Sequence, residues 1–505
     1  MTVINQSVEG FRSISPAEFF YRNRQMAGFG NSTQSVYSTL RELVENSLDA
    51  CEDAQCIPKI RITIDSLPSD VLSIRVADNG TGLPYQQVPE AFGRVLYGSK
   101  YDQKQKRGTF GLGVTMAILY GQITADSPVF IHTQNSSGPG RIYSLLIDVE
   151  KNLPIIENER EKSRSKDGTT VAITLRGDLK RAKERVVEYI RLTTIASPHA
   201  VIEFGFDGES TEVVGGWSHK VPDAPVSSKP HPRVADLELL RRMMARSPST
   251  KIHDFLVDSF QQVGTRTATR FLKFVGIDPG LRIESLTRAD ITSLSLSLRR
   301  FDGFGPPDSR CLSPIGEEAF LLSVESLFSN SWMHYSKRSP SEWQGHPFFV
   351  EGIIAVGNEF PKGDTPTLYR FANRVPLLYD ASDDILTKSV KRLNWKHYGI
   401  SVPMPVALFI HFGSTKVPYR AAGKQSLAHM KEIETDVTGL IRSLGRSLRK
   451  FACRKEQSKR DARKMQEFSE MFKIVTKYGP ALAEVEPPSS TTHMVRSLFE
   501  VNTDV

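Results

Sequence analysis

Residues 41–49 read RELVENSLD, and this stretch decides how the first part of the chain is interpreted. It lies within residues 33–52, where apolar side chains recur at intervals of three and four, the spacing of an amphipathic helix. Glu42 and Asn46 fall on one face of that helix, and the apolar positions centre on the opposite face. The helix is therefore expected to pack by one side and to present a carboxylate and an amide from the other.

A carboxylate in this position can take a proton from water in a phosphoryl transfer. An amide oxygen can ligate Mg2+ without adding negative charge beside phosphate groups. An isolated ExxxN pair is more often the polar exterior of a helix, so its interpretation depends on the segments that follow.

Two strands with alternating apolar residues are predicted next, at 60–64 and 72–76. The second strand ends in the turn DNGTG, which begins at Asp78. A carboxylate there can accept a hydrogen bond from the amino group of adenine, and Gly80 and Gly82 allow a base to approach the backbone closely. An ordinary turn is the alternative.

A glycine-rich segment, RGTFGLG at 107–113, opens an apolar helical run. Around Gly108, Gly111 and Gly113, backbone N–H groups and the helix dipole can hold phosphates. The preceding residues, 101–106, are polar and do not form the strand that a dinucleotide-binding loop requires. The chain also has no GxxxxGK[ST] sequence, which excludes a P-loop enzyme by that route.

The composition is that of an ordinary multidomain protein. The chain has 505 residues, of which 39% are hydrophobic and 24% charged. No apolar run reaches the ~18 residues of a membrane span, and no secretory signal is recognisable. The four cysteines include no CxxC pair, so a zinc site is not expected and the thiols should be reduced. These features predict a soluble, cytosolic protein.

The positive charge is concentrated in one segment. The formal net charge is +8, and residues 442–464 contain ten basic and two acidic residues, which accounts for the whole surplus. Such a segment suits contact with a polyanion. A solvated helix that its charges keep soluble is the alternative.

The remainder of the chain is predicted to change from helices to strands and back to one helix. Residues 235–300 have the pattern of short helices, and strand-like segments follow at 347–356, 367–371 and 404–412. From Gln425 onward apolar residues step by three and four, which predicts one long helix with a seam.

The order of these motifs resembles that of the GHKL ATPase superfamily, which includes gyrase, MutL proteins, ninety-kilodalton heat-shock chaperones and histidine kinases. A Gly-Thr strand at 168–173 completes the series. The resemblance implies ATP and Mg2+ as cofactors, with Glu42 as general base, Asn46 as Mg2+ ligand and Asp78 as the acceptor for adenine. The further nucleotide contacts that it implies are Gly80, Gly82, Ser99, Lys100, Gly108, Thr109, Phe110, Gly111, Leu112, Gly113, Val114, Thr115 and Thr169.

Outside these motifs the chain resembles the B subunits of archaeal-type DNA topoisomerase VI, a type IIB enzyme. The stretches that carry this resemblance are 15–20, 23–29, 91–101, 308–317, 345–348, 394–399 and 414–419. They run in family order from about residue 10 to about residue 480. The chain departs from the family at Glu45, where Asp is commoner, and in a lengthened insert at 328–346. Neither departure affects a predicted nucleotide contact.

The resemblance implies a multidomain α+β fold. A GHKL (Bergerat) ATPase α/β sandwich with an N-terminal strap would occupy residues 1–228, and a helical helix-two-turn-helix domain 229–307. An α/β transducer sheet of the ribosomal S5-like kind would occupy 308–424. A stalk helix with the docking segment for the A subunit would follow at 425–478, and a flexible tail at 479–505.

The implied activity is that of an ATP-hydrolysing topoisomerase subunit. ATP-driven dimerisation of two B subunits would gate double-strand cleavage and passage by the A subunit in an A2B2 heterotetramer, relaxing supercoils and decatenating DNA. Lys396 would reach from the transducer to the γ-phosphate, as a catalytic residue. We find no ExxxDxD arrangement of acids, so cleavage must reside on another polypeptide. The expected location is cytoplasmic and nucleoid-associated, in an archaeal-like cell.

Two contacts are expected from the long helix. Its basic residues would bind double-stranded DNA without sequence preference, since no base-reading motif accompanies them. Farther along, an apolar stripe is predicted to dock on a partner. The alternative is that this segment folds back onto its own transducer. The stripe consists of Phe468, Met471, Phe472, Val475 and Tyr478.

Two other functions compete with this one. A non-catalytic B-like scaffold of a meiotic-type break-forming complex would be expected to lose Glu42, Asn46 or the glycine triplet, and all are present. A MutL-like repair ATPase would lack both the helix-two-turn-helix segment and the WKxYG sequence that begins at Trp395.

Overall fold

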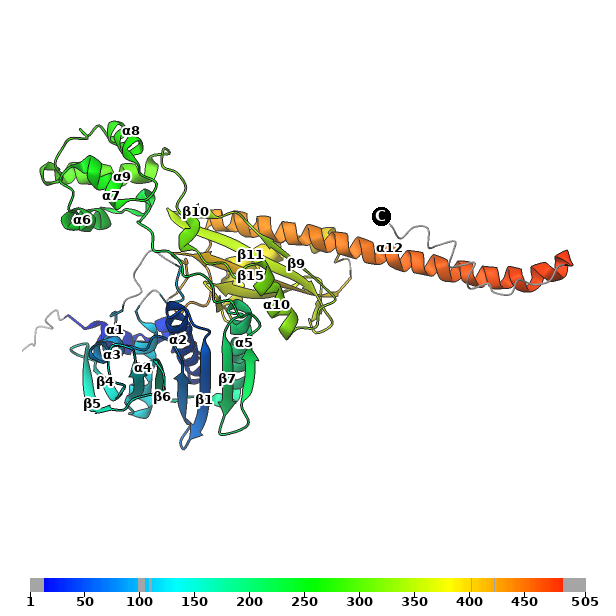
Figure 1. Cartoon of the computed structure of the whole chain (residues 1–505), viewed down its shortest axis with the longest axis horizontal. Coiled ribbons are helices and arrows are strands. Elements are labelled where there is room, and N and C mark those ends of the chain that lie inside the picture. The colour runs from blue at the N-terminus through cyan, green and yellow to red at the C-terminus, as the bar shows by residue number, and fades with distance from the viewer. Residues whose placement is uncertain (1–12, 99–104, 109–110, 401, 422, 485–505) are drawn as a thin grey trace, which may run out of the picture.

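The computed structural model describes residues 13–98, 105–108, 111–400, 402–421 and 423–484. It contains two mixed sheets, a separate group of short helices and one very long C-terminal helix (Figure 1). The multidomain α+β fold is therefore confirmed. Within the described residues, no helix combines the length and the apolar character needed to cross a membrane.

The first sheet has eight strands in the order β5-β4-β3-β6-β2-β1-β7-β8. Its strands are β1 (Lys59–Leu67), β2 (Val71–Ala77), β3 (Val129–Gln134), β4 (Arg141–Asp148), β5 (Leu153–Glu161), β6 (Gly168–Arg176), β7 (Val201–Phe206) and β8 (Glu212–Gly215). All neighbouring pairs are antiparallel except β1 and β7. The two predicted strands at 60–64 and 72–76 are confirmed as β1 and β2.

Three helices pack on this sheet and on one another: α2 (Ser32–Asp53), α4 (Gly113–Ala125) and α5 (Leu179–Ala196). The apolar side chains of α2 that predicted the helix, among them Leu40, Val44 and Leu48, are buried in the shared core. A short helix, α1 (Pro16–Arg22), and α3 (Val88–Gly93) lie beside them. The first twelve residues of the predicted strap lie outside the described residues.

The group of short helices consists of α6 (Leu237–Arg246), α7 (Ile252–Ser259), α8 (Thr265–Val275) and α9 (Arg288–Arg300). It has a core of its own, in which Phe255, Phe271 and Leu298 are fully buried. In Figure 1 it lies apart from both sheets. The helices predicted for 235–300 are thus confirmed, while the domain boundaries proposed at 228 and 307 stay predictions.

The second sheet has seven strands, and its central strands are covered on both faces. Its strands are β9 (Trp332–Lys337), β10 (Ser341–Trp343), β11 (His346–Val356), β12 (Lys362–Gly363), β13 (Thr367–Ala372), β14 (Val375–Pro376) and β15 (Met404–Ser414). Helix α10 (Glu317–Leu327) packs on one face, with the end of α5. Helix α11 (Ile385–Arg392) and the C-terminal helix pack on the other. The insert 328–346 supplies β9 and β10, which both pair with β11, so it is part of this sheet.

The long helix, α12, runs from Lys431 to Ala483. The predicted start at Gln425 is wrong, because the chain first pairs Leu427 with Tyr419 in an isolated bridge. The predicted tail boundary at 479 is also too early, since the helix continues to Ala483. The seam residues Ile433 to Leu448 are buried on the second sheet, and beyond Phe451 the helix extends away from it (Figure 1).

Candidate active site

A cavity of about 530 Å³ opens between α2, the turn after β2 and the start of α4. The predicted residues that line it are Glu42, Asn46, Asp78, Gly82, Gly108, Gly111, Leu112, Gly113, Val114, Thr115 and Thr169. Segments far apart in the chain therefore meet in one place. Four predicted contacts, Ser99, Lys100, Thr109 and Phe110, lie outside the described residues.

Asp78 lines the cavity and is held there by three hydrogen bonds. Its Oδ1 accepts hydrogen bonds from the backbone N–H groups of Gly80 and Thr169, each at 3.0 Å, and its Oδ2 accepts one from Ser47 Oγ at 3.1 Å. Burial raises the pKa of the Asp78 carboxyl, and these donors offset part of that rise. The Thr169 hydroxyl is held at 3.0 Å from that of Thr133. The carboxyl is thus fixed in place and still lines the cavity.

Two glycines are required by close contacts. Gly82 has φ +62°, and a Cβ there would lie 1.8 Å from the carbonyl oxygen of Gln134. A Cβ on Gly113 would lie 1.7 Å from Glu42 Oε2. Because Gly113 is the first residue of α4, only glycine lets the N-terminus of that helix approach the Glu42 carboxylate. The positive end of the helix dipole therefore faces the part of the cavity next to Glu42.

Glu42 belongs to a buried group of four charges. Its Oε1 lies 2.6 Å from Arg41 Nη2 and 3.6 Å from Lys424 Nζ, and Lys424 Nζ lies 2.8 Å from Glu45 Oε2. Arg41 also donates to the carbonyl oxygen of Gly423 at 2.6 Å. Part of the polar face of α2 is therefore covered by the loop that connects the second sheet to α12.

Lys424 was not predicted from the sequence, although it lines the cavity and is 4% exposed. Burial acts to lower its pKa, but the charges of Glu42 and Glu45 outweigh that effect and raise it above the usual value. The lysine is therefore a cation, supplied to the cavity by the second sheet's loop. A single lysine in an irregular loop has no periodic pattern by which the sequence could have revealed it.

The structure does not bring Lys396 to the cavity, which corrects that prediction. Lys396 lies exposed on a short turn, Trp395–Tyr398, beside α12. Trp395 anchors this turn, because its ring is 2% exposed in the second sheet's core and its Nε1 donates to the carbonyl oxygen of Val390 at 3.0 Å. The lysine of the second sheet that reaches the cavity is Lys424.

The cavity fits ATP and Mg2+ by the chemistry of its lining. It combines a fixed carboxyl, glycines that leave space against a helix N-terminus, and a cation. Among the described residues, no group of three or more His, Cys, Asp or Glu side chains could hold a metal ion. Asn46 lines the cavity, and its amide oxygen is of the kind that could ligate Mg2+ together with waters and phosphate oxygens.

Comparisons with known proteins match two parts of the chain to families and nearly the whole chain to named relatives. Residues 31–178 match the family described as histidine kinase-, DNA gyrase B-, and HSP90-like ATPase. Residues 307–464 match the family described as the transducer of the topoisomerase VI B subunit. A protein of Saccharolobus islandicus, named as the B subunit of type 2 DNA topoisomerase 6, is 39% identical, covering 90% of this chain and 88% of that protein. A protein of the same name from Metallosphaera sedula is 41% identical, covering 94% of this chain and 90% of that protein.

Proposed function

We infer the function from one premise: the chain belongs to the B-subunit family of type 2 DNA topoisomerase 6. It is accordingly the ATPase-domain subunit of a type IIB topoisomerase. We propose that it binds and hydrolyses ATP, and that the ATP-dependent association of two such chains controls double-strand cleavage and passage by an A subunit. The observation that carries this proposal is the cavity in which Glu42, Asn46, Asp78, the glycine-rich segment and Lys424 meet.

Each lining group has a proposed part in ATP turnover. Asp78 would accept a hydrogen bond from the adenine amino group, because it is a fixed acceptor in the cavity lining. The N-terminus of α4 would bind the phosphates. Glu42 would take the proton of the attacking water. Mg2+, when bound through Asn46, would neutralise charge on the phosphates.

Lys424 would sense the terminal phosphate. It approaches from the second sheet, so its pairing with ATP rather than with Glu42 and Glu45 would tie hydrolysis to movement of that sheet. This role replaces the one that was predicted for Lys396.

Replacing the two lysines separately tests this assignment. Lys424→Gln should lower the kcat for ATP about 100-fold to 1,000-fold, because a cation is removed from the developing charge on the phosphates. Lys396→Gln should leave the ATPase rate without DNA unchanged, since that side chain lies exposed outside the cavity. Steady-state ATPase assays on both variants decide the matter. Equal losses in the two variants would contradict the assignment.

The proposed partners are inferred from the exposed basic and apolar side chains of α12. Its basic residues Arg449, Lys450, Arg454 and Lys455 are exposed, which supports sequence-independent contact with double-stranded DNA. Most of the apolar stripe beyond them is exposed as well, with Met471, Val475 and Tyr478 at 54%, 55% and 57%, while Phe472 is half-buried. This exposure supports docking on a partner over folding back onto the transducer. An A subunit is the proposed occupant.

A plasmid assay tests the function as a whole. Supercoiled plasmid should relax when this chain, an A subunit, ATP and Mg2+ are all present, and should stay supercoiled when any one is left out. Relaxation without nucleotide would contradict the proposed coupling. ATP hydrolysis without relaxation by the assembled complex would favour a different task for the ATPase, such as MutL-like repair, whereas no hydrolysis would favour the scaffold.

A further inference from the structure

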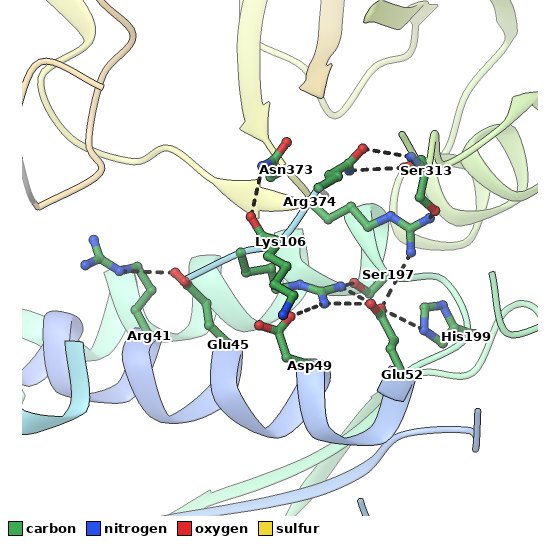
Figure 2. Close-up of polar contacts among 12 residues, drawn as sticks. Arg41, Glu45, Asp49, Glu52, Lys106, Ser197, His199, Ser313, Asn373 and Arg374 are labelled. Carbon is green, nitrogen blue, oxygen red and sulfur yellow. Dashed lines mark hydrogen bonds and ion pairs between the residues drawn. The ribbon is translucent and has the colours of Figure 1, made fainter. Parts of the chain in front are cut away.

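A second buried charge cluster lies at the C-terminal end of α2, where Figure 2 shows Asp49 and Glu52 beside His199 and Arg374. It consists of Asp49, Glu52, Arg107, Ser197, His199 and Arg374, and we call it the Arg107 cluster. Its members come from α2, from the start of the glycine-rich segment, from the residues just after α5 and from the second sheet. The proposed reaction uses none of them.

Arg107 is the centre of the cluster. Its Nη1 lies 2.9 Å from Asp49 Oδ1 and 2.8 Å from Glu52 Oε2, and its Nη2 lies 2.7 Å from Glu52 Oε1. The side chain is 3% exposed. Burial alone would raise the pKa of the Glu52 carboxyl, but Arg107, His199 and Arg374 hold it well below its usual range. Since Gly108 follows Arg107 and lines the cavity, these ion pairs fix the beginning of the phosphate-binding segment on α2.

The segment before α10 and the second sheet hold the two residues before Arg107. Gln105 and Ser313 exchange hydrogen bonds, from Gln105 Nε2 to the Ser313 carbonyl oxygen at 3.1 Å and from the Ser313 N–H to Gln105 Oε1 at 2.8 Å. Asn373 Nδ2 donates to the carbonyl oxygen of Lys106 at 2.9 Å, as Figure 2 shows. The start of the glycine-rich segment is therefore attached both to α2 and to the transducer sheet.

Arg374 contacts both Glu52 on α2 and Ser313, which binds Gln105. Its backbone conformation is unusual. Asn373 and Arg374 form the turn between β13 and β14, with φ +46° and +66°. Two-residue turns of this kind favour glycine, because a Cβ is strained at such angles by about 1 kcal/mol or more. The arginine nevertheless occupies the turn and places Nη1 3.5 Å from Glu52 Oε1 and Nη2 2.9 Å from Ser313 Oγ. Arginine thus stands at a position where the backbone angles alone would favour glycine, and its side chain makes the contacts with Glu52 and Ser313.

The turn is also fixed to the centre of the sheet. The backbone N–H of Arg374 donates to His411 Nε2 at 3.0 Å, and His411 Nδ1 lies 2.7 Å from Glu351 Oε1. His411 on β15 and Glu351 on β11 are both fully buried. Because α12 packs on β11, a rotation of this sheet with α12 would carry Arg374 with it.

We propose that the Arg107 cluster is a second coupling point between the transducer and the nucleotide cavity, with Arg374 as a positioning residue that acts through Glu52 and Arg107 on the glycine-rich segment. This proposal rests on the ATPase function proposed above and adds to the direct contact of Lys424. When the transducer is seated as in this structure, the cluster is complete and the segment is held for turnover. When the sheet rotates, Glu52 and Arg107 lose Arg374, and the segment loses its attachment through Asn373.

The variant Arg374→Gly tests the proposal with little risk to the fold. It removes the guanidinium while giving the turn the residue that its φ favours, and Glu52 keeps Arg107 as a partner. The kcat for ATP should fall about tenfold or more, since small misplacements of reacting groups have effects of this size. The Kd of a non-hydrolysable ATP analogue should stay within about twofold, because Arg374 does not line the cavity, and the variant should remain folded at the assay temperature.

Gln344→Gly is the matched control. Gln344 is exposed in the turn between β10 and β11, with φ +49°, so the change gives the same backbone relief on the same sheet away from the cluster. It should leave kcat unchanged. Combining Arg374→Gly with Glu52→Gln should lower kcat no more than the more severe single change, because both act on one network.

Three results would overturn the proposal. The first is an unchanged kcat in Arg374→Gly. The second is a loss of kcat matched by the loss of folded protein, which would leave Arg374 a purely structural role. The third is additive loss in the double variant, which would separate Arg374 from Glu52. A wild-type chain without ATP turnover would instead refute the proposed function, so the two failures are distinguishable.

Discussion

Glu42→Gln is expected to abolish ATP turnover while leaving nucleotide binding intact. The amide keeps the shape of the carboxylate beside Gly113 but cannot take a proton from water, and loss of a general base lowers rates by about 10² to 10⁴-fold. The measurements are the Kd of ATP by calorimetry and the kcat of hydrolysis. Turnover at the wild-type rate would remove Glu42 from the mechanism.

Glu45→Gln is the matched control for this prediction. It removes the same negative charge from the same buried group, three residues along the same helix, but Glu45 does not line the cavity. The loss of kcat should therefore be less than about tenfold, through a weakened hold on Lys424. If both variants lost activity equally, the charge balance around Arg41 and Lys424 would explain the effect, and base catalysis by Glu42 would not be needed.

Deleting residues 466–505 is expected to abolish binding of the A subunit while ATP-dependent dimerisation persists. The buried seam of α12 on the transducer ends near Phe451, so the deletion leaves that packing in place. The deleted part carries the exposed apolar stripe, and apolar side chains of this kind usually dominate interface energies. Light scattering with a non-hydrolysable analogue and co-purification with the A subunit measure the two properties.

Two further variants separate the apolar stripe from the basic region of α12. The Kd for the A subunit should rise about 100-fold or more when Ser replaces Met471, Val475 and Tyr478 in the full chain, as several interface side chains are lost together. Reversing Arg449, Lys450, Arg454 and Lys455 to Glu should not release the A subunit, but should weaken the stimulation of ATPase by DNA and flatten its salt dependence. If the truncated chain still co-purified with the A subunit, the contact would have to lie on the transducer.

The sequence by itself determined the secondary structure around the cavity and the motifs that line it. The periodicity of 33–52 placed Glu42 and Asn46 on one face of a helix, and the alternation before Asp78 ended a strand at the right residue. These features are local, because side-chain direction follows from the helix and strand repeats within a few residues. The resemblance in motif order then identified the family, although the roles of the site residues stay proposals.

Only the tertiary structure decided which distant charges complete the site. Lys424 and Glu45 are separated by 379 positions, and Asn373 and Lys106 by 267. Such contacts arise when a loop or turn that belongs to the second sheet packs against α2 or against the glycine-rich segment. They have no periodic pattern in the sequence. Trp395 made Lys396 the more prominent candidate, yet burial of that ring holds the lysine on the far side of the sheet, beside α12. The arginine in the turn at Arg374 became recognisable only once its backbone angle and its approach to Glu52 were seen together, because strain and long-range pairing are properties of the folded chain.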